Sequence, residues 1–255
     1  MLPRPDWIAL SADERRRLRY IWDDTRASQD VTGNVGWVLE AAVRLSVRAQ
    51  LTLCVGLYES IVWRFEGLHH RDEALQVAEA AWCATVDPRY LRFYELTRTD
   101  WVGPVEGPLW CAMAWLEPAV RIGHQFPAEL YDAIGYLGCL AQHVAPQPEA
   151  WGAWLEGALE RLVARHPPHE DDPFDDPFGR RIGTRLGPLV GRGIFDPHHE
   201  PSARADAAFL AGVLADAQAS GNPFLANPGD LKDAGFVGTP YRLDPPNSYP
   251  QAKNA

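Results

Sequence analysis

Two kinds of residue are scarce or unevenly placed in this sequence. Lysine occurs only at positions 232 and 253, so arginine supplies nearly all of the 24 basic residues. None of the ten tryptophans follows residue 154, whereas 13 of the 22 prolines lie in the last 90 residues. The chain therefore divides into an aromatic-rich body, residues 1–165, and a tail rich in proline, glycine and aspartate, residues 166–255, which we expect to pack on the body.

The features of an exported or membrane-spanning protein are also missing. The N-terminal residues contain no basic region followed by an apolar run and a small-residue cleavage site. The most apolar stretch, residues 51–65, is interrupted by Glu59 and Arg64, so it does not read as a transmembrane helix. We therefore expect a cytoplasmic protein without a membrane partner.

The composition argues for a globular protein that does not bind nucleic acid. Hydrophobic residues make up 46% of the chain and charged residues 23%, which is typical of a folded domain. The net charge is −10, and a polyanion such as DNA or RNA would be repelled by it. This leaves a small molecule or another protein as the partner, and we expect another protein.

The sequence contains no recognisable catalytic or cofactor-binding motif. It has no phosphate-binding loop, no dinucleotide-binding turn, no serine-hydrolase elbow and no zinc-binding helix pattern. Its four cysteines, Cys54, Cys83, Cys111 and Cys139, lie in apolar contexts without a CxxC pair, so we predict buried free thiols. Their near-regular spacing leaves a degenerate helical repeat open. We expect no cofactor.

Apolar residues spaced by three and four, together with prolines at expected helix starts, predict an all-α fold. We predict an irregular bundle or short array of about seven or eight helices, with the Pro/Gly-rich tail packed on it. A capping box at Ser11 and Glu14 marks the first start, and Pro118 is expected to kink or split one helix. The expected helices span residues 11–26, 43–65, 72–85, 88–97, 108–122, 128–143, 149–165 and, in the tail, 203–219.

Residues 179–194 carry the most unusual local pattern, in which glycine and an aliphatic residue each recur every four positions. Four arginines in this segment, Arg180, Arg181, Arg185 and Arg192, make it a candidate site for a partner or an anion, because glycine-rich backbone and guanidinium groups both donate to anions. The alternative is a structural loop whose arginines pair with the aspartates of residues 171–176.

Other patterns in the sequence receive structural interpretations. His166, His169, His198 and His199 are weak candidates for metal binding, but they lie in Pro-rich loops without a fixed ligand spacing, so we predict no metal site. Asp-Pro-Phe at 172–174 and 176–178, and Asn-Pro-Phe at 222–224, are interpreted as turns that a phenylalanine pins to an apolar surface. The aromatic residues between 90 and 101 either line a groove or, as we expect, join the core.

Two functions follow as expectations. The first is a non-catalytic, cytoplasmic protein-binding protein, such as a bacterial immunity protein, an effector adaptor or a chaperone, because the chain is acidic, helical and without a catalytic motif. The second is an α-helical enzyme that acts on a phosphorylated or acidic substrate through residues 179–194.

Overall fold

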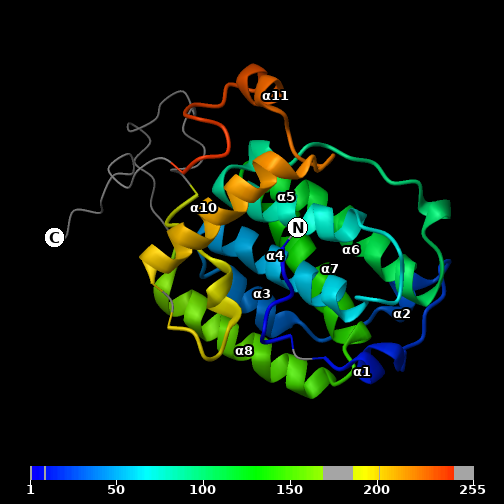
Figure 1. Cartoon of the computed structure of the whole chain (residues 1–255). Helices are drawn as coiled ribbons and strands as arrows, with labels where there is room; N and C mark the ends of the chain where they lie inside the picture. Colours follow the sequence, from blue (N-terminus) through cyan, green and yellow to red (C-terminus); the bar gives the residue numbers. More distant parts are fainter. Residues whose placement is uncertain (1, 9, 169–185, 201, 244–255) are drawn as a thin grey trace.

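The computed structural model describes residues 2–8, 10–168, 186–200 and 202–243, and this part of the chain is all helical (Figure 1). It contains no strand; its one bridge pairs Leu91 with Leu225. The predicted all-α fold is confirmed, and seven helices of the described residues have seven or more residues.

The α-helices are α1 (Ala12–Arg16), α2 (Ala27–Asp30), α3 (Gly36–Ala42), α4 (Val47–Arg64), α5 (Glu73–Val86), α6 (Gly103–Ile122), α7 (Pro127–Val144), α8 (Pro148–Arg165), α10 (Ala203–Ser220) and α11 (Pro228–Asp233). The 3-10 helices are η1 (Pro88–Tyr90), η2 (Arg98–Asp100) and η3 (Arg192–Phe195).

Helix α4 lies at the centre of the molecule, with α5, α6 and α7 packed around it (Figure 1). The sequence predicts that this helix begins at residue 43, but it begins at Val47. Ser46 is its N-cap, and its side chain accepts from the N–H of Ala49 at 3.3 Å. A separate helix, α3, precedes Ser46. Val43, the first residue of the predicted helix, is 61% exposed and does not join the core. Gly56 does not interrupt α4; it makes room for the ring of Phe195.

The first predicted helix is wrong over most of its length. The capping box at Ser11 and Glu14 is present, but α1 ends at Arg16 instead of continuing to residue 26. The carbonyl oxygens of Arg15 and Arg17 accept from the guanidinium of Arg64 at 2.5 and 3.0 Å, so they are not used by a continuing helix. Ile21, an apolar residue within the predicted helix, is 76% exposed.

The predicted helix at 88–97 is also wrong, because its backbone groups form hydrogen bonds with residues of the tail. Only the single turn η1 forms. The carbonyl of Tyr90 then accepts from the N–H of Ala226 at 3.0 Å, and the N–H of Arg92 donates to the carbonyl of Phe224 at 2.8 Å. These two groups would otherwise bond within a helix, so the pairing of two distant segments replaces local structure here.

Helix α6 runs without a break through two prolines. It begins at Gly103, five residues before the predicted start at 108, and continues past Pro118 to Ile122, so the expectation of a split is wrong. Asp24 holds the start of α6 by accepting from the N–H of Gly103 at 2.8 Å, and it also pairs with Arg98 at 2.8 Å. A side chain from the irregular stretch after α1 therefore positions this helix.

The described part of the tail packs on the body as the turn and helix signals predict. Helix α10 ends at Gly221, which adopts a left-handed conformation with φ 65°, and it lies against α5 (Figure 1). In the Asn-Pro-Phe turn, the side chain of Asn222 accepts from the N–H of Phe224 at 2.9 Å. The ring of Phe224 meets that of Tyr94 edge-on at 5.0 Å, which confirms a turn pinned by its phenylalanine.

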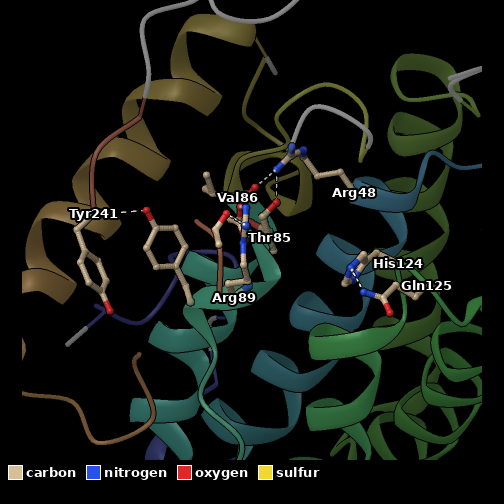
Figure 2. A network of polar contacts seen from close by, with 10 residues as sticks. Arg48, Thr85, Val86, Arg89, His124, Gln125 and Tyr241 are labelled. Carbon is tan, nitrogen blue, oxygen red and sulfur yellow. Dashed lines mark hydrogen bonds and ion pairs between the residues drawn. The ribbon is translucent and has the colours of Figure 1, made fainter. Parts of the chain in front are cut away.

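Polar contacts tie the C-terminal end of α5, and the turn η1 that follows it, to distant segments. Figure 2 shows Arg48, near the start of α4, reaching the end of α5, where its guanidinium donates to the carbonyls of Thr85 and Val86. On the other side, the N–H of Tyr241 donates to the hydroxyl of Tyr90 at 2.9 Å (Figure 2). Tyr241 has φ 60°, a conformation that is unfavourable for a tyrosine, so these contacts hold the tail in place against local strain.

All four cysteines are free, as predicted. Cys54, Cys83 and Cys111 are buried and Cys139 is half-buried, and burial raises the pKa of each thiol, that of Cys111 to about 11. They lie on four successive helices, α4 to α7. Within the described residues, no helix is both long enough and apolar enough to cross a membrane.

We predict that Gly56→Ala destabilises the protein by about 1–3 kcal/mol, because the added methyl group would collide with the ring of Phe195 inside a packed core. Gly152→Ala in α8 is the matched control. Nothing lies within 4 Å of its added methyl group, so this variant should be stabilised by about 0.5–1 kcal/mol. Urea unfolding followed by circular dichroism measures both; equal stabilities for the two variants would contradict the close packing at Gly56.

Candidate functional site

Three neighbouring hollows surround the N-terminal segment, residues 2–20, where it passes the end of α4 and the turn between α7 and α8. The central hollow shares Ile8 with one neighbour and Ala145 and Pro146 with the other. In Figure 1 this segment runs from the N-terminus across the face of the bundle to α1. We call the three hollows together the N-terminal groove. It is the candidate site.

The central hollow is mostly apolar and has a volume of about 280 Å³. Three tryptophans from two segments face it, Trp7 from the N-terminal segment and Trp151 and Trp154 from α8, where their spacing of three places them on one side of the helix. Its remaining lining comes from the N-terminal segment, α4, α7 and the start of α8: Ile8, Leu10, Glu14, Ser60, Arg64, Ala141, Val144, Ala145, Pro146, Gln147 and Ala150.

The two charged groups in the central hollow are held by the protein itself. Arg64 is buried, and burial lowers its pKa. Its guanidinium donates to the carbonyl of Val144 at 2.9 Å, in addition to the carbonyls of Arg15 and Arg17. The carboxylate of Glu14 accepts from the hydroxyl of Ser11 at 2.7 Å, and this bond lowers the pKa of Glu14. The hollow therefore presents apolar surface with fixed polar groups, not a free acid or base.

The 3-10 helix η3 holds the tryptophan walls in position. The indole N–H of Trp154 donates to the carbonyl of Phe195 at 2.9 Å, and Arg161 donates to the carbonyl of Ile194 at 2.8 Å. Trp7 lies 5.7 Å from the guanidinium carbon of Arg192. The indole N–H of Trp151 is buried without a hydrogen-bond partner among the described residues, so packing alone orients that ring.

A buried ion pair fastens η3 to the central helix. Arg192 binds Glu59 of α4 through two hydrogen bonds, Nε to Oε2 at 2.9 Å and Nη2 to Oε1 at 2.5 Å. The side chains are only 7% and 2% exposed. The same guanidinium donates through Nη1 to the carbonyl of Pro3 at 2.7 Å. One arginine thus joins the core, the tail and the N-terminal segment that forms the groove.

Charged side chains occupy the two outer hollows. One is lined by Arg4, Arg15 and Glu66. The carboxylate of Glu66 lies 2.7 Å from the guanidinium of Arg4 and 3.6 Å from that of Arg15. Asp6 lies in the same hollow. The other contains Arg19, Tyr20, Asp30 and His143, and Asp30 lies 3.5 Å from Arg26. The groove therefore has an apolar centre, and each of its two ends contains charged side chains.

Of the four arginines predicted to bind a partner or an anion, Arg192 alone lies among the described residues. Arg192 is buried and its donors are used by Glu59 and Pro3. Arg180, Arg181 and Arg185 lie outside the described residues, as do the first two Asp-Pro-Phe turns. For these three arginines the prediction stays a prediction, and the structure places Arg192 in the framework of the protein instead.

Three of the four histidine candidates lie among the described residues. His166 is buried at the end of α8, and His198 and His199 follow η3, while His169 lies outside the described residues. Across the described ranges, no group of three or more histidine, cysteine, aspartate or glutamate side chains is arranged to hold a metal ion. Of the aromatic residues between 90 and 101, Tyr90 and Trp101 are buried in the core as expected, and Tyr94 packs against it. Phe93 is 59% exposed, so the expectation is wrong for that residue.

The sequence reasoning missed the N-terminal groove. The sequence feature that could have indicated the groove is the pair Trp151 and Trp154 near the start of α8. Two tryptophans on one side of a helix, close to a turn that contains prolines, form a large apolar surface. Trp7 could not be connected with them, since more than 140 residues separate it from α8 along the chain. The chain matches no family model, and neither a curated protein nor a solved structure matches it.

Replacing Glu59 by Gln should lower the free energy of unfolding by about 3–5 kcal/mol, because it leaves the buried charge of Arg192 without its counter-charge. Asp13→Asn is the control. It removes an exposed pair with Arg16, at 3.5 Å, that contributes only about 0–1 kcal/mol. Denaturant unfolding of both variants provides the measurement, and a loss below about 1 kcal/mol for Glu59→Gln would be incompatible with the described ion pair.

His166 should make the protein less stable as the pH falls below neutrality. Its ring nitrogens are buried and have no hydrogen-bond partner among the described residues, and burial lowers its pKa from 6.5 to about 4. Between these values the unfolded state binds more protons, so stability decreases from pH 6.5 downward, by up to about 2 kcal/mol at about pH 5. His166→Phe should lose this part of the pH dependence; parallel stability curves for the two proteins between pH 7 and about 4 would refute it.

Proposed function

We propose that this chain is a non-catalytic protein-binding protein that holds a segment of its partner in the N-terminal groove. The observation that carries the proposal is the anatomy of the groove, an apolar centre walled by Trp7, Trp151 and Trp154 between two ends that contain charged side chains. Protein interfaces have this arrangement of an apolar core and a polar rim.

The residue types in the groove support a protein partner. Tryptophan and arginine are the residues most enriched among those that dominate binding energy at interfaces. The groove contains three tryptophans, and Arg4, Arg15 and Arg19 lie at its ends. Lysine, which is depleted at interface cores, is absent from its lining.

The size of the central hollow supports a side chain as its occupant. At about 280 Å³ it falls just below the range of roughly 300–1,000 Å³ that is common for sites of drug-sized ligands. The two outer hollows extend the surface along the chain direction of residues 4–20, which suits an extended segment. An immunity protein, an effector adaptor or a chaperone in a bacterial cytoplasm would use such a surface, and the partner's identity would distinguish these roles.

The test is selection of peptides that bind the purified protein from a random library displayed on phage. We expect enriched peptides whose affinity falls about tenfold or more for Ala150→Phe, since Ala150 is exposed at the edge of the central hollow and a phenyl ring there would fill it. Ala211→Phe, at an exposed position of α10, is the matched control and should bind as the wild type does. Failure to enrich any peptide, or equal binding to all three proteins, would reject the proposal.

A further inference from the structure

We infer that the central hollow binds an uncharged aromatic ring system of about the size of indole, supplied by a tryptophan side chain of the partner segment. This inference rests on the proposed function and adds the chemistry of the occupant. It follows from three properties of the hollow, which are the engagement of its polar side chains, its volume and its aromatic walls.

The polar side chains that line the central hollow form hydrogen bonds within the protein. Both carboxylate oxygens of Glu14 are acceptors, Oε2 from the hydroxyl of Ser11 at 2.7 Å and Oε1 from the amide of Gln147 at 2.9 Å. The hydroxyl of Ser60 donates to the carbonyl of Leu57 at 2.7 Å. The side chains of Glu14, Gln147 and Ser60 are therefore held by the protein before any occupant arrives.

The one arginine of the central hollow is engaged in the same way. Each of the three guanidinium nitrogens of Arg64 donates to a backbone carbonyl. The indole N–H of Trp154 donates to the carbonyl of Phe195, and that of Trp151 is buried. A charged occupant would lose its hydration here without gaining a counter-charge of its own, which is costly, whereas an uncharged apolar group has no such cost.

The volume of the central hollow favours a ring system larger than benzene. An apolar cavity of roughly 150 Å³ inside a protein is large enough to bind benzene. The central hollow, at about 280 Å³, is nearly twice that size. The two fused rings of an indole therefore fill it better than a single phenyl ring or a short aliphatic side chain.

The walls of the central hollow favour an aromatic occupant over an aliphatic one. Aromatic rings gain from offset and edge-to-face contacts with one another, beyond the burial of their area. Two of the three tryptophan walls are held from behind, because Trp7 lies 5.7 Å from the guanidinium carbon of Arg192 and the rings of Trp154 and Phe195 lie 5.9 Å apart. Binding therefore does not have to order these walls, which favours affinity.

The charges at the two ends of the groove balance one another. The outer hollows are lined by three arginines and three carboxylates: Arg4, Arg15, Arg19, Asp6, Asp30 and Glu66. With equal numbers of each sign, attraction and repulsion largely cancel for a charged segment. The residues beside the inserted tryptophan therefore need no net charge, and binding should depend little on salt.

The experiment uses fluorescence anisotropy with short fluorescein-labelled peptides in which one variable residue lies between glycine and serine residues. We expect the tryptophan probe to bind most tightly and the leucine probe at least about threefold more weakly. The alanine, lysine and glutamate probes should each bind at least about tenfold more weakly. The Kd of the tryptophan probe should change less than about twofold as NaCl rises from about 0.05 to 0.3 M.

The variants and a competitor locate the binding and identify its source. Ala150→Phe should weaken binding of the tryptophan probe about tenfold or more, and Ala211→Phe should leave it unchanged. N-acetyltryptophanamide carries the same indole group without the flanking segment. It should displace the labelled probe only at a concentration at least about threefold higher than the unlabelled tryptophan peptide requires.

The outcomes separate this inference from the proposed function. Equal or tighter binding of the leucine, lysine or glutamate probe, or wild-type affinity in the Ala150→Phe protein, would overturn the tryptophan occupant. Displacement by N-acetyltryptophanamide at the concentration of the peptide would assign the hollow to a free aromatic molecule and would overturn the partner's side chain as the source. If library peptides still required the open hollow at Ala150, the protein-binding function would stand without this inference. If no probe bound, the inference would again be overturned, and the library selection would decide the function by itself.

Discussion

The buried ion pair between Glu59 and Arg192 is the constraint on which the rest of the structure depends. Removing two charges from water costs several kcal/mol for each ion, and only close pairing with further hydrogen bonds offsets that cost. Here the carboxylate receives two bonds from one guanidinium, whose remaining bond goes to Pro3. Neither residue can leave without exposing the other to an apolar core, so α4, η3 and the N-terminal segment are bound to one another.

The candidate site exists because of that connection. The N-terminal segment forms one wall of the groove and α8 the other, and η3 contacts both through Arg192 and the carbonyls of Ile194 and Phe195. The close approach of Phe195 to Gly56 brings η3 directly onto the central helix. A surface for binding is therefore built on three parts of the chain that are far apart in sequence, with rigid support from the core.

The helices that follow sequence patterns most closely are those whose apolar face meets the core. The expected boundaries at 72–85, 128–143, 149–165 and 203–219 differ from the structure by at most one residue at either end. The failures have a common physical origin. After Arg16 the backbone carbonyls are taken by Arg64, and after Tyr90 the backbone pairs with the Asn-Pro-Phe region, so distant polar groups satisfied hydrogen bonds that a helix would otherwise have made.

The sequence by itself determined the all-α class, the principal helices, the burial of three of the four cysteines and the pinned turn at residues 222–224, because each depends on local periodicity, capping or turn chemistry. Only the tertiary structure decided where Trp7 lies relative to Trp151 and Trp154, and that Arg192 serves the framework. A local pattern cannot specify which distant partner a side chain meets. Burial of apolar surface and pairing of buried charge across the whole molecule select that partner, and they placed the groove.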